Sequence, residues 1–383
     1  MMADDPPADI IEIGGAPRDD RPRRPWRRWL PLVLVAGVAL AIYARSNVDN
    51  QPEPPPATRS PSATAAAPPA TPTATAPVVT EVGRPLLGID AGWQLYGRGP
   101  GVVVRVDFAQ GRITTTAVPT LSSSGPVSFL AGPDRVVVRP LDAVPGYVVP
   151  DGGPAAQATA GLAHSGPMLP GPDPTSVWVS DNVGERMLRV RFDGRPTNES
   201  LALPRGTNGF AEPDGGGYPL VSATSGAYTL RPDGVRRITT GDVLAVGAGH
   251  WLARECDAGL RCGTVLIEQR TGGRHAVRLG PDVADLSAGL TSADGTRAAM
   301  LVTGPREPRI HLLDLGSGRS DTVDLPLDPG FFPQQQMVWS PDGRWLFVLA
   351  GGGRLHAVEA ATARTRQLDV ALPHLDQLAL RAG

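Results

Sequence analysis

Residues 102–118 of the chain read VVVRVDFAQGRITTTAV, an apolar run that breaks at a short turn around Gly111 and then resumes. Runs rich in Val, Ile and Thr on both sides of a glycine turn predict a β-hairpin. The same pattern recurs at 187–203, 227–240, 264–279, 309–325 and 354–370, with a weaker example at 147–157. The hairpin is therefore one unit of an internal repeat.

The turns of these units align on one position each. The aligned residues are Gly111, Gly152, Gly194, Gly234, Gly273, Gly318 and Ala363. Successive positions lie about forty residues apart, which is the period of the four-stranded blades of a β-propeller. The seven units of residues 84–383 predict an all-β fold, a seven-bladed β-propeller.

A second turn precedes a short hydrophobic strand in most units. Its acidic residues are Asp134, Asp173, Asp214, Asp294 and Asp342, usually with Pro before and Gly after. Pro fixes φ, Asp bonds to nearby backbone N–H groups, and Gly accepts a positive φ. Each period therefore contains enough strands and turns for one blade.

Residues 340–346, SPDGRWL, and the weaker 292–296, SADGT, resemble the SPDG turn of TolB-like and related WD-repeat-like propellers. The resemblance covers residues 84–383 and implies a propeller of the membrane-anchored, bacterial extracytoplasmic type. It implies no single function, because such propellers serve as scaffolds, ligand binders and occasional enzymes. The Gly-His and Trp-Asp pairs of strict WD repeats are absent from the units.

The N-terminal third has a different composition. Residues 1–28 are polar, which predicts a disordered cytoplasmic tail, and residues 29–44, WLPLVLVAGVALAIYA, carry no charge. Six arginines before this stretch and one after it favour a single-pass signal anchor with the N-terminus in the cytoplasm. A cleaved secretory signal and a buried core helix are the alternatives. The first two interpretations both export the rest of the chain.

Residues 45–83 follow the apolar stretch and are dominated by Pro, Ala, Thr and Ser. Such a composition cannot form a core and favours extended polyproline II. We therefore expect a linker that holds the propeller away from the membrane, so that residues 84–383 lie outside the cell membrane.

Cys256 and Cys262 are the only cysteines. They flank a turn-rich segment, DAGLR, between two strand-like runs, and in an exported protein this spacing predicts a disulfide across a hairpin. A zinc site formed with His250 and His275 is an alternative, although the spacing fits no compact ligand motif. A pair of free thiols is the third possibility.

No motif for catalysis, cofactors or metal ions stands out elsewhere. The six histidines are dispersed, and no nucleophile elbow, Walker loop or EF-hand loop is present. We therefore predict no catalytic, cofactor-binding or metal-binding residues. Phe331 and Phe332, on a loop between units, are expected to be buried between blades or to form a contact patch.

Three functions follow from these observations. The first is a membrane-tethered, non-enzymatic propeller that binds a protein, a glycan or a small ligand on one rim. The second is an enzyme, a lyase or hydrolase, with polar residues converging on the central channel. The third is a signalling subunit whose cytoplasmic tail docks a partner. A net charge of −2 gives no reason to expect nucleic acid as a partner.

The C-terminal residues 375–381, LDQLALR, follow a last unit whose strands are already accounted for. A propeller has to join its first and last blades, because open sheet edges promote aggregation. We expect 375–381 to become the innermost strand of the first blade, beside residues 93–96. Residues 86–89 are the rival for that position.

Overall fold

The computed structural model describes residues 75–119, 127–141, 146–162, 166–181, 185–204, 208–259, 261–279, 286–302, 309–327 and 333–381. The predicted tail 1–28, the predicted anchor 29–44 and most of the predicted linker lie outside these residues. Strands account for most of the described chain, together with the short 3₁₀ segments Leu86–Gly88, Ala160–Leu162 and Pro333–Gln336. No helix in the described part has the length and apolar character that a membrane crossing requires.

Most strands pair antiparallel with strands that are their neighbours in sequence. The first sheet has the order β1-β4-β3-β2-β29, with β1 (Val78–Glu81), β2 (Gln94–Gly99), β3 (Val102–Asp107), β4 (Arg112–Ala117) and β29 (Gln377–Arg381). The second sheet comprises β5 (Val127–Ala131), β6 (Arg135–Pro140), β7 (Tyr147–Pro150) and β8 (Ala156–Gln157).

Three further sheets have four strands each. The third contains β9 (Met168–Pro170), β10 (Ser176–Ser180), β11 (Arg186–Arg191) and β12 (Pro196–Ala202). The fourth contains β13 (Asn208–Pro213), β14 (Pro219–Ala223), β15 (Gly226–Arg231) and β16 (Gly234–Thr239). The last contains β25 (Met337–Trp339), β26 (Trp345–Ala350), β27 (Arg354–Glu359) and β28 (Thr365–Gln367).

The remaining sheet has eight strands and corrects the predicted blade number. Its halves are β17 (Val243–Val246), β18 (His250–Cys256), β19 (Cys262–Glu268) and β20 (Arg274–Val277), and β21 (Leu286–Thr291), β22 (Arg297–Val302), β23 (Arg309–Asp314) and β24 (Ser320–Val323). The first strands of the two halves pair in parallel, Ala245 with Gly289 and Val246 with Leu290. Two sequence units therefore share one sheet, and the structure has six separate sheets where the sequence predicted seven.

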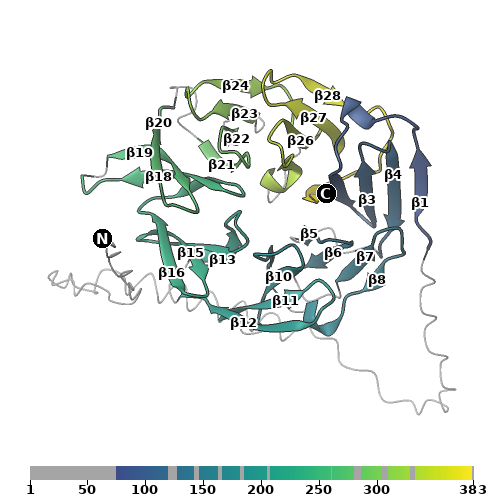
Figure 1. Cartoon of the computed structure of the whole chain (residues 1–383), viewed down its shortest axis with the longest axis horizontal. Coiled ribbons are helices and arrows are strands. Elements are labelled where there is room, and N and C mark those ends of the chain that lie inside the picture. Colours follow the sequence, from purple (N-terminus) through teal and green to yellow (C-terminus); the bar gives the residue numbers. More distant parts are fainter. Residues whose placement is uncertain are drawn as a thin grey trace, which may run out of the picture. The chain divides into compact units, whose positions relative to one another are not determined.

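The sheets are arranged in a ring, which is the β-propeller architecture (Figure 1). The innermost strands are β29, β5, β9, β13, β17, β21 and β25; β29 contacts both β5 and β25, and β17 contacts β21. The outermost strands, such as β12, β20 and β24, lie on the periphery (Figure 1). The all-β propeller prediction is confirmed.

The ring closes through the C-terminal strand, as the sequence predicted. β29 pairs antiparallel with β2 along its whole length, from Gln94 opposite Arg381 to Arg98 opposite Gln377. The rival segment is not a strand, because Leu86–Gly88 forms a 3₁₀ turn in which Leu87 has a φ of 54°. The N-terminal and C-terminal parts of the described chain thus share one sheet.

The predicted linker also contributes to this sheet. β1 lies within residues 45–83 and pairs with β4 on the outer edge, with Val78 opposite Thr115. Val78 and Val79 are 64% and 53% exposed. The strand therefore lacks the pattern of buried apolar residues by which a strand is recognised in a sequence. The folded part therefore begins before the predicted boundary at Arg84.

The Asp turns are held by side-chain bonds to their own backbone. Ser340 Oγ lies 2.5 Å from Asp342 Oδ1 and accepts the N–H of Trp345 at 2.9 Å. Asp342 Oδ1 also accepts the N–H of Arg344 at 3.1 Å. Asp214 is fully buried and accepts the N–H groups of Gly216 and Tyr218. The recurring Asp is therefore a structural residue of the turn, which agrees with its predicted role.

The aligned turn residues adopt the left-handed conformation in most units. Gly152 has a φ of 69° and Gly318 a φ of 73°. In the fifth unit Gly272, next to the aligned Gly273, has the positive φ. Ala363 takes the left-handed conformation as well, with a φ of 53°, although its Cβ makes this conformation unfavourable.

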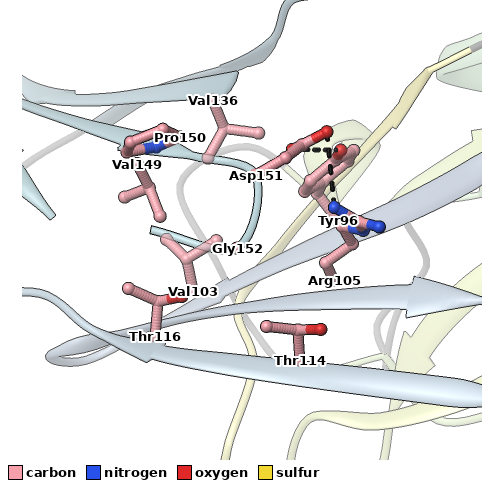
Figure 2. A pocket seen from close by; sticks show the side chains of 10 residues that line it. All are labelled: Tyr96, Val103, Arg105, Thr114, Thr116, Val136, Val149, Pro150, Asp151 and Gly152. Atoms are coloured by element: carbon pink, nitrogen blue, oxygen red, sulfur yellow. Dashed lines mark hydrogen bonds and ion pairs between the residues drawn. The ribbon is translucent and has the colours of Figure 1, made fainter. Parts of the chain in front are cut away.

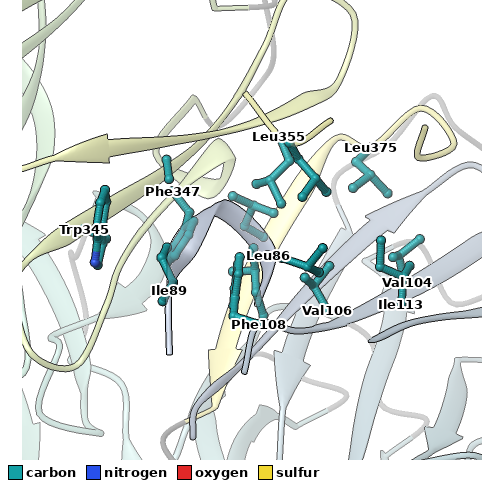
Figure 3. Close-up of a cluster of buried hydrophobic side chains, with 14 of the residues drawn as sticks. Leu86, Ile89, Val104, Val106, Phe108, Ile113, Trp345, Phe347, Leu355 and Leu375 are labelled. Carbon is teal, nitrogen blue, oxygen red and sulfur yellow. The ribbon is translucent and has the colours of Figure 1, made fainter. Parts of the chain in front are cut away.

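Apolar side chains fill the spaces between adjacent sheets. Where the first sheet meets the last, Phe108 stacks on Phe347 with ring centroids 4.9 Å apart (Figure 3). Trp93 meets both rings edge-on. Leu375, just before β29, belongs to the same cluster. The closing strand is therefore held by apolar packing as well as by strand pairing.

Candidate functional site

The two cysteines close the tip of the β18–β19 hairpin. Cys256 and Cys262 are opposite residues in the strand register, their Cα atoms are 4.0 Å apart, and their sulfur atoms are bonded. The predicted disulfide is confirmed. A zinc site with these thiolates is ruled out, because both are consumed in the disulfide and His250 lies at the other end of β18.

The described residues contain no group of three or more His, Cys, Asp or Glu side chains that could hold a metal ion. The dispersed histidines that are described lie in or beside strands, and burial lowers the pKa of His356 in β27. Phe331 and Phe332 lie outside the described residues, so their predicted burial or contact role stays a prediction.

The alternative hypothesis of an enzyme places its catalytic groups in the central channel. The innermost strands are built mainly of apolar and small residues, and within their ranges only Arg381 and Glu212 are ionisable. Glu212 is exposed. These two side chains stand on β29 and β13, and no third ionisable residue of an innermost strand accompanies them.

A more polar site lies where the first sheet meets the second. A pocket there is lined by Tyr96, Val103, Arg105, Thr114, Thr116, Val136, Val149, Pro150, Asp151 and Gly152 (Figure 2). Valines of β3, β6 and β7 form its apolar side, and Tyr96, Arg105 and Asp151 gather at one end of it (Figure 2). An apolar wall with a few convergent polar groups is the usual composition of a ligand site.

The strand register explains how the polar groups of the first sheet come together. Tyr96 of β2 lies opposite Arg105 of β3, and Arg105 lies opposite Thr114 of β4. Residues directly opposite one another in antiparallel strands point to the same face of the sheet. Tyr96, Arg105 and Thr114 therefore form one row on the face that looks toward the second sheet.

Asp151 reaches this row from the turn between β7 and β8. Its Oδ1 accepts the hydroxyl of Tyr96 at 3.0 Å, and its Oδ2 lies 3.3 Å from Arg105 Nη1 and 2.5 Å from Arg381 Nη2. Gly152, which follows it, has the left-handed φ that the tight turn requires. The aligned turn of the second unit thus places a carboxylate over the first sheet.

Arg381 joins three parts of the ring at this point. Its Nη2 donates to Gln94 Oε1 as well as to Asp151, and its Nη1 donates to the carbonyl of Gly132 at 3.2 Å. Its guanidinium carbon lies 5.1 Å from the centre of the Tyr96 ring, within the range of a cation–π interaction. The last residue of β29 is therefore fixed to β2 and to the second sheet.

Arg105 is bound less completely. Its ion pair with Asp151 is its only polar contact among the described residues, and its side chain retains 20% exposure. Two guanidinium groups share a single carboxylate here, so the cluster carries an excess positive charge. Burial, reinforced by Asp151, raises the pKa of Tyr96 well above its usual value, so its hydroxyl remains a neutral donor.

Sequence reasoning did not find this site. Its polar residues stand at positions 94, 96, 105, 151 and 381, in strands and turns that no local motif connects. The aligned turn at Gly152 was recognised, but its neighbour Asp151 carried no signal of a function. Register between β2 and β3 was the one piece of information that could have placed Tyr96 beside Arg105.

Comparison with known proteins gives only the fold. No protein-family model and no curated protein matches the chain. The solved structures that resemble it include TolB from Acinetobacter baumannii, 14% identical over 76% of this chain and 67% of that chain, with a TM-score of 0.41.

Two other solved structures are similar to the same degree. AztD from Citrobacter koseri is 12% identical, covering 78% of this chain and 89% of that chain, with a TM-score of 0.43. A functionally unknown protein from Desulfotomaculum acetoxidans is 13% identical, covering 76% and 99%, with a TM-score of 0.45. The predicted likeness to TolB-like propellers is confirmed as a likeness of fold, which the strand order and the ring carry.

Proposed function

We propose that the chain is a membrane-tethered, extracytoplasmic binding module that takes a carboxylate-bearing ligand at the pocket between the first and second sheets. The observation that carries this proposal is Arg105, a guanidinium that borders the pocket with one shared ion pair and no hydrogen bond among the described residues. A guanidinium presents parallel N–H groups that match the two oxygens of a carboxylate.

The rest of the pocket suits the same ligand. The hydroxyls of Thr114 and Thr116 supply uncharged polar contacts, and the valines supply an apolar surface for the ligand's carbon skeleton. The carboxylate end of an acidic sugar, or an acidic side chain of a partner protein, has this combination of groups. The scarcity of ionisable residues on the innermost strands supports binding over catalysis in the channel.

A pair of matched sugars tests the proposal. Glucuronate and glucose share a ring and differ in the carboxylate at C6. We expect glucuronate to raise the melting temperature of the protein in a saturable manner at constant ionic strength, and glucose to have no such effect. Arg105→Met should abolish the response while it leaves the melting temperature without ligand nearly unchanged, since a partly exposed ion pair contributes about 0–1 kcal/mol.

The matched control is Arg112→Met, which removes an exposed arginine on the outer part of the same sheet. A response to glucuronate that survives in Arg105→Met, or an equal response to glucose, would rule out carboxylate recognition by this arginine. Loss of the response in both variants would point to a general charge effect.

Export of the propeller is the second part of the proposal, and it rests on the arginines before residues 29–44. Alkaline phosphatase fused after Val82 should be active, and a reporter that works only in the cytoplasm should be inactive there. The reverse pattern would overturn the extracytoplasmic location. The mass of the mature protein distinguishes a retained anchor from a cleaved signal.

A further inference from the structure

Arg139 of β6 is one of the largest fully buried side chains of the protein, with 1% exposure. Its Nη2 donates to the carbonyl of Gly166, just before β9. Its Nε and Nη1 atoms are also buried, and neither has a hydrogen-bond partner among the described residues. Most of the donor capacity of this guanidinium is therefore unused.

The charge of Arg139 is uncompensated as well. None of the acidic side chains in the described residues forms an ion pair with it, whereas Arg135 on the same strand pairs with Asp134 at 2.6 Å. Burial lowers the pKa of Arg139 to about 10, so the group is still protonated at neutral pH. Buried charges in proteins are normally paired, and a water molecule can satisfy an N–H group but cannot neutralise it.

The surroundings of Arg139 favour an oxyanion. Ser128 of β5 is its direct partner in the strand register, so both side chains point to the face that meets the third sheet. Ser128 Oγ accepts the N–H of Met168 at 3.0 Å, which leaves its own O–H to donate. Since Nη2 has two hydrogens and one goes to Gly166, at least one edge of the guanidinium retains two parallel N–H groups.

We propose that a small oxyanion, with a carboxylate as the model ligand, binds between the second and third sheets to the free edge of Arg139 and the hydroxyl of Ser128. This site is separate from the pocket at Arg105, because Arg139 faces the third sheet and the pocket borders the first. An anion bound at this site would link the second sheet to the third.

The full chain labelled with ¹⁵N-arginine tests this directly. Acetate is the probe and acetamide, which has the same shape without the charge, is its control. The Nε–H of Arg139 should give a slowly exchanging signal, identified by its loss in Arg139→Lys. We expect acetate to move this signal in a saturable manner and acetamide to leave it in place. An Nε–H signal that does not respond to acetate would overturn the proposal.

Thermal unfolding provides a second measurement. Acetate should raise the melting temperature of the wild-type protein by roughly 2–4 °C at saturation. In a protein that already carries Arg105→Met, Arg139→Gln should remove this rise, whereas the matched control Arg135→Gln on the same strand should retain it. The response at Arg139 should persist in Arg105→Met, which separates this site from the proposed function.

The rival partner is a carboxylate of the chain itself. Asp142 stands three positions after Arg139 and lies outside the described residues. If Asp142 occupies the site, Asp142→Asn should shift the Arg139 Nε–H signal in the absence of acetate, and acetate should shift that signal only in the variant. These two results together would show that the proposal is wrong. A signal that responds to acetate equally in wild type and Asp142→Asn supports it.

Discussion

The first sheet has two neighbours in the ring, and it meets them in different ways. Its junction with the last sheet is apolar, with Phe108 and Phe347 packed together (Figure 3) and Trp93 against both rings. Its junction with the second sheet has an apolar part too, but Tyr96, Arg105 and Asp151 gather at one end of a pocket (Figure 2), and Arg381 pairs with Asp151. The two faces of one sheet therefore differ in chemical character.

The difference follows from where the ring closes. β29 comes from the C-terminus and is joined to its sheet by non-covalent contacts alone, so its closure depends on packing. The junction of the first sheet with the second depends less on apolar packing, because one continuous stretch of chain connects these two sheets. It can therefore contain charged groups whose bonding capacity is incomplete, which stability alone would not favour.

The largest test of this comparison removes the closing strand. Deleting residues 374–383 takes away the pairing with β2 and the buried side chains of Leu375 and Leu378. We expect the melting temperature to fall by about 10 °C or more, because burying each leucine contributes about 1.5–3 kcal/mol. Binding of a hydrophobic dye should increase as the edge of β2 is exposed.

The control for this deletion is the removal of residues 382–383 alone, which leaves β29 intact. A long deletion that melts like the full chain would show that strand closure by β29 does not hold the ring together.

A single substitution tests the apolar junction. Phe347 is fully buried, and Phe347→Ala leaves a cavity beside Phe108 and Trp93. We expect a loss of about 3–5 kcal/mol in the free energy of unfolding. Phe129→Ala, at the junction with the second sheet, is the matched variant, and it should cost less because Phe129 retains 8% exposure. Equal losses in chemical denaturation would contradict the difference between the junctions.

Sequence alone predicted much of the fold because its signals are local. Glycine turns and Asp turns repeat with the period of a blade, and a pair of cysteines across a short turn has few structural options. The closing role of 375–381 was predicted because a ring leaves one strand position to be filled. These inferences needed no information about contacts between distant segments.

The features that the sequence did not predict depend on such contacts. The parallel pairing of β17 with β21 joins two units at only two residue pairs, and no residue type marks it. The polar cluster needs Tyr96, Asp151 and Arg381 to meet, and the charge of Arg139 is notable only once its burial is known. β1 was not predicted from the sequence, because exposed edge strands need few apolar residues.

The polar junction should respond to alkaline pH. Tyrosines of the unfolded chain ionise near pH 10, whereas burial and Asp151 raise the pKa of Tyr96 in the folded protein. The unfolded state therefore releases a proton first, and the stabilisation that is present below pH 10 is lost as the pH rises above it. One such group gives a slope of at most about 1.4 kcal/mol per pH unit.

Tyr96→Phe should remove this part of the alkaline slope, and Tyr147→Phe, which keeps Tyr96, serves as the control. The measurement is the free energy of unfolding in urea between pH 8 and pH 11, values chosen to bracket the ordinary tyrosine pKa. An unchanged slope in Tyr96→Phe would mean that this hydroxyl is ionised equally in both states.

The smallest effect compares the same turn in the two sheets that flank the first. Ala363, between β27 and β28, and Gly152, between β7 and β8, both have a positive φ, of 53° and 69°. The left-handed conformation costs a residue with a Cβ about 1–2 kcal/mol, and glycine's greater freedom in the unfolded chain offsets about 0.5–1 kcal/mol of that difference. Ala363→Gly should therefore stabilise the protein by about 0.5–1 kcal/mol.

Gly152→Ala should destabilise it by a similar amount through φ alone, since a Cβ at that position would meet no atom within 4 Å. Opposite shifts in the urea midpoint, with unchanged slopes, would show that both turns obey one backbone rule although only Gly152 borders the proposed ligand pocket. If Gly152→Ala also loses the glucuronate response, then the turn at Gly152 positions Asp151, and the pocket depends on the backbone conformation of this repeated turn.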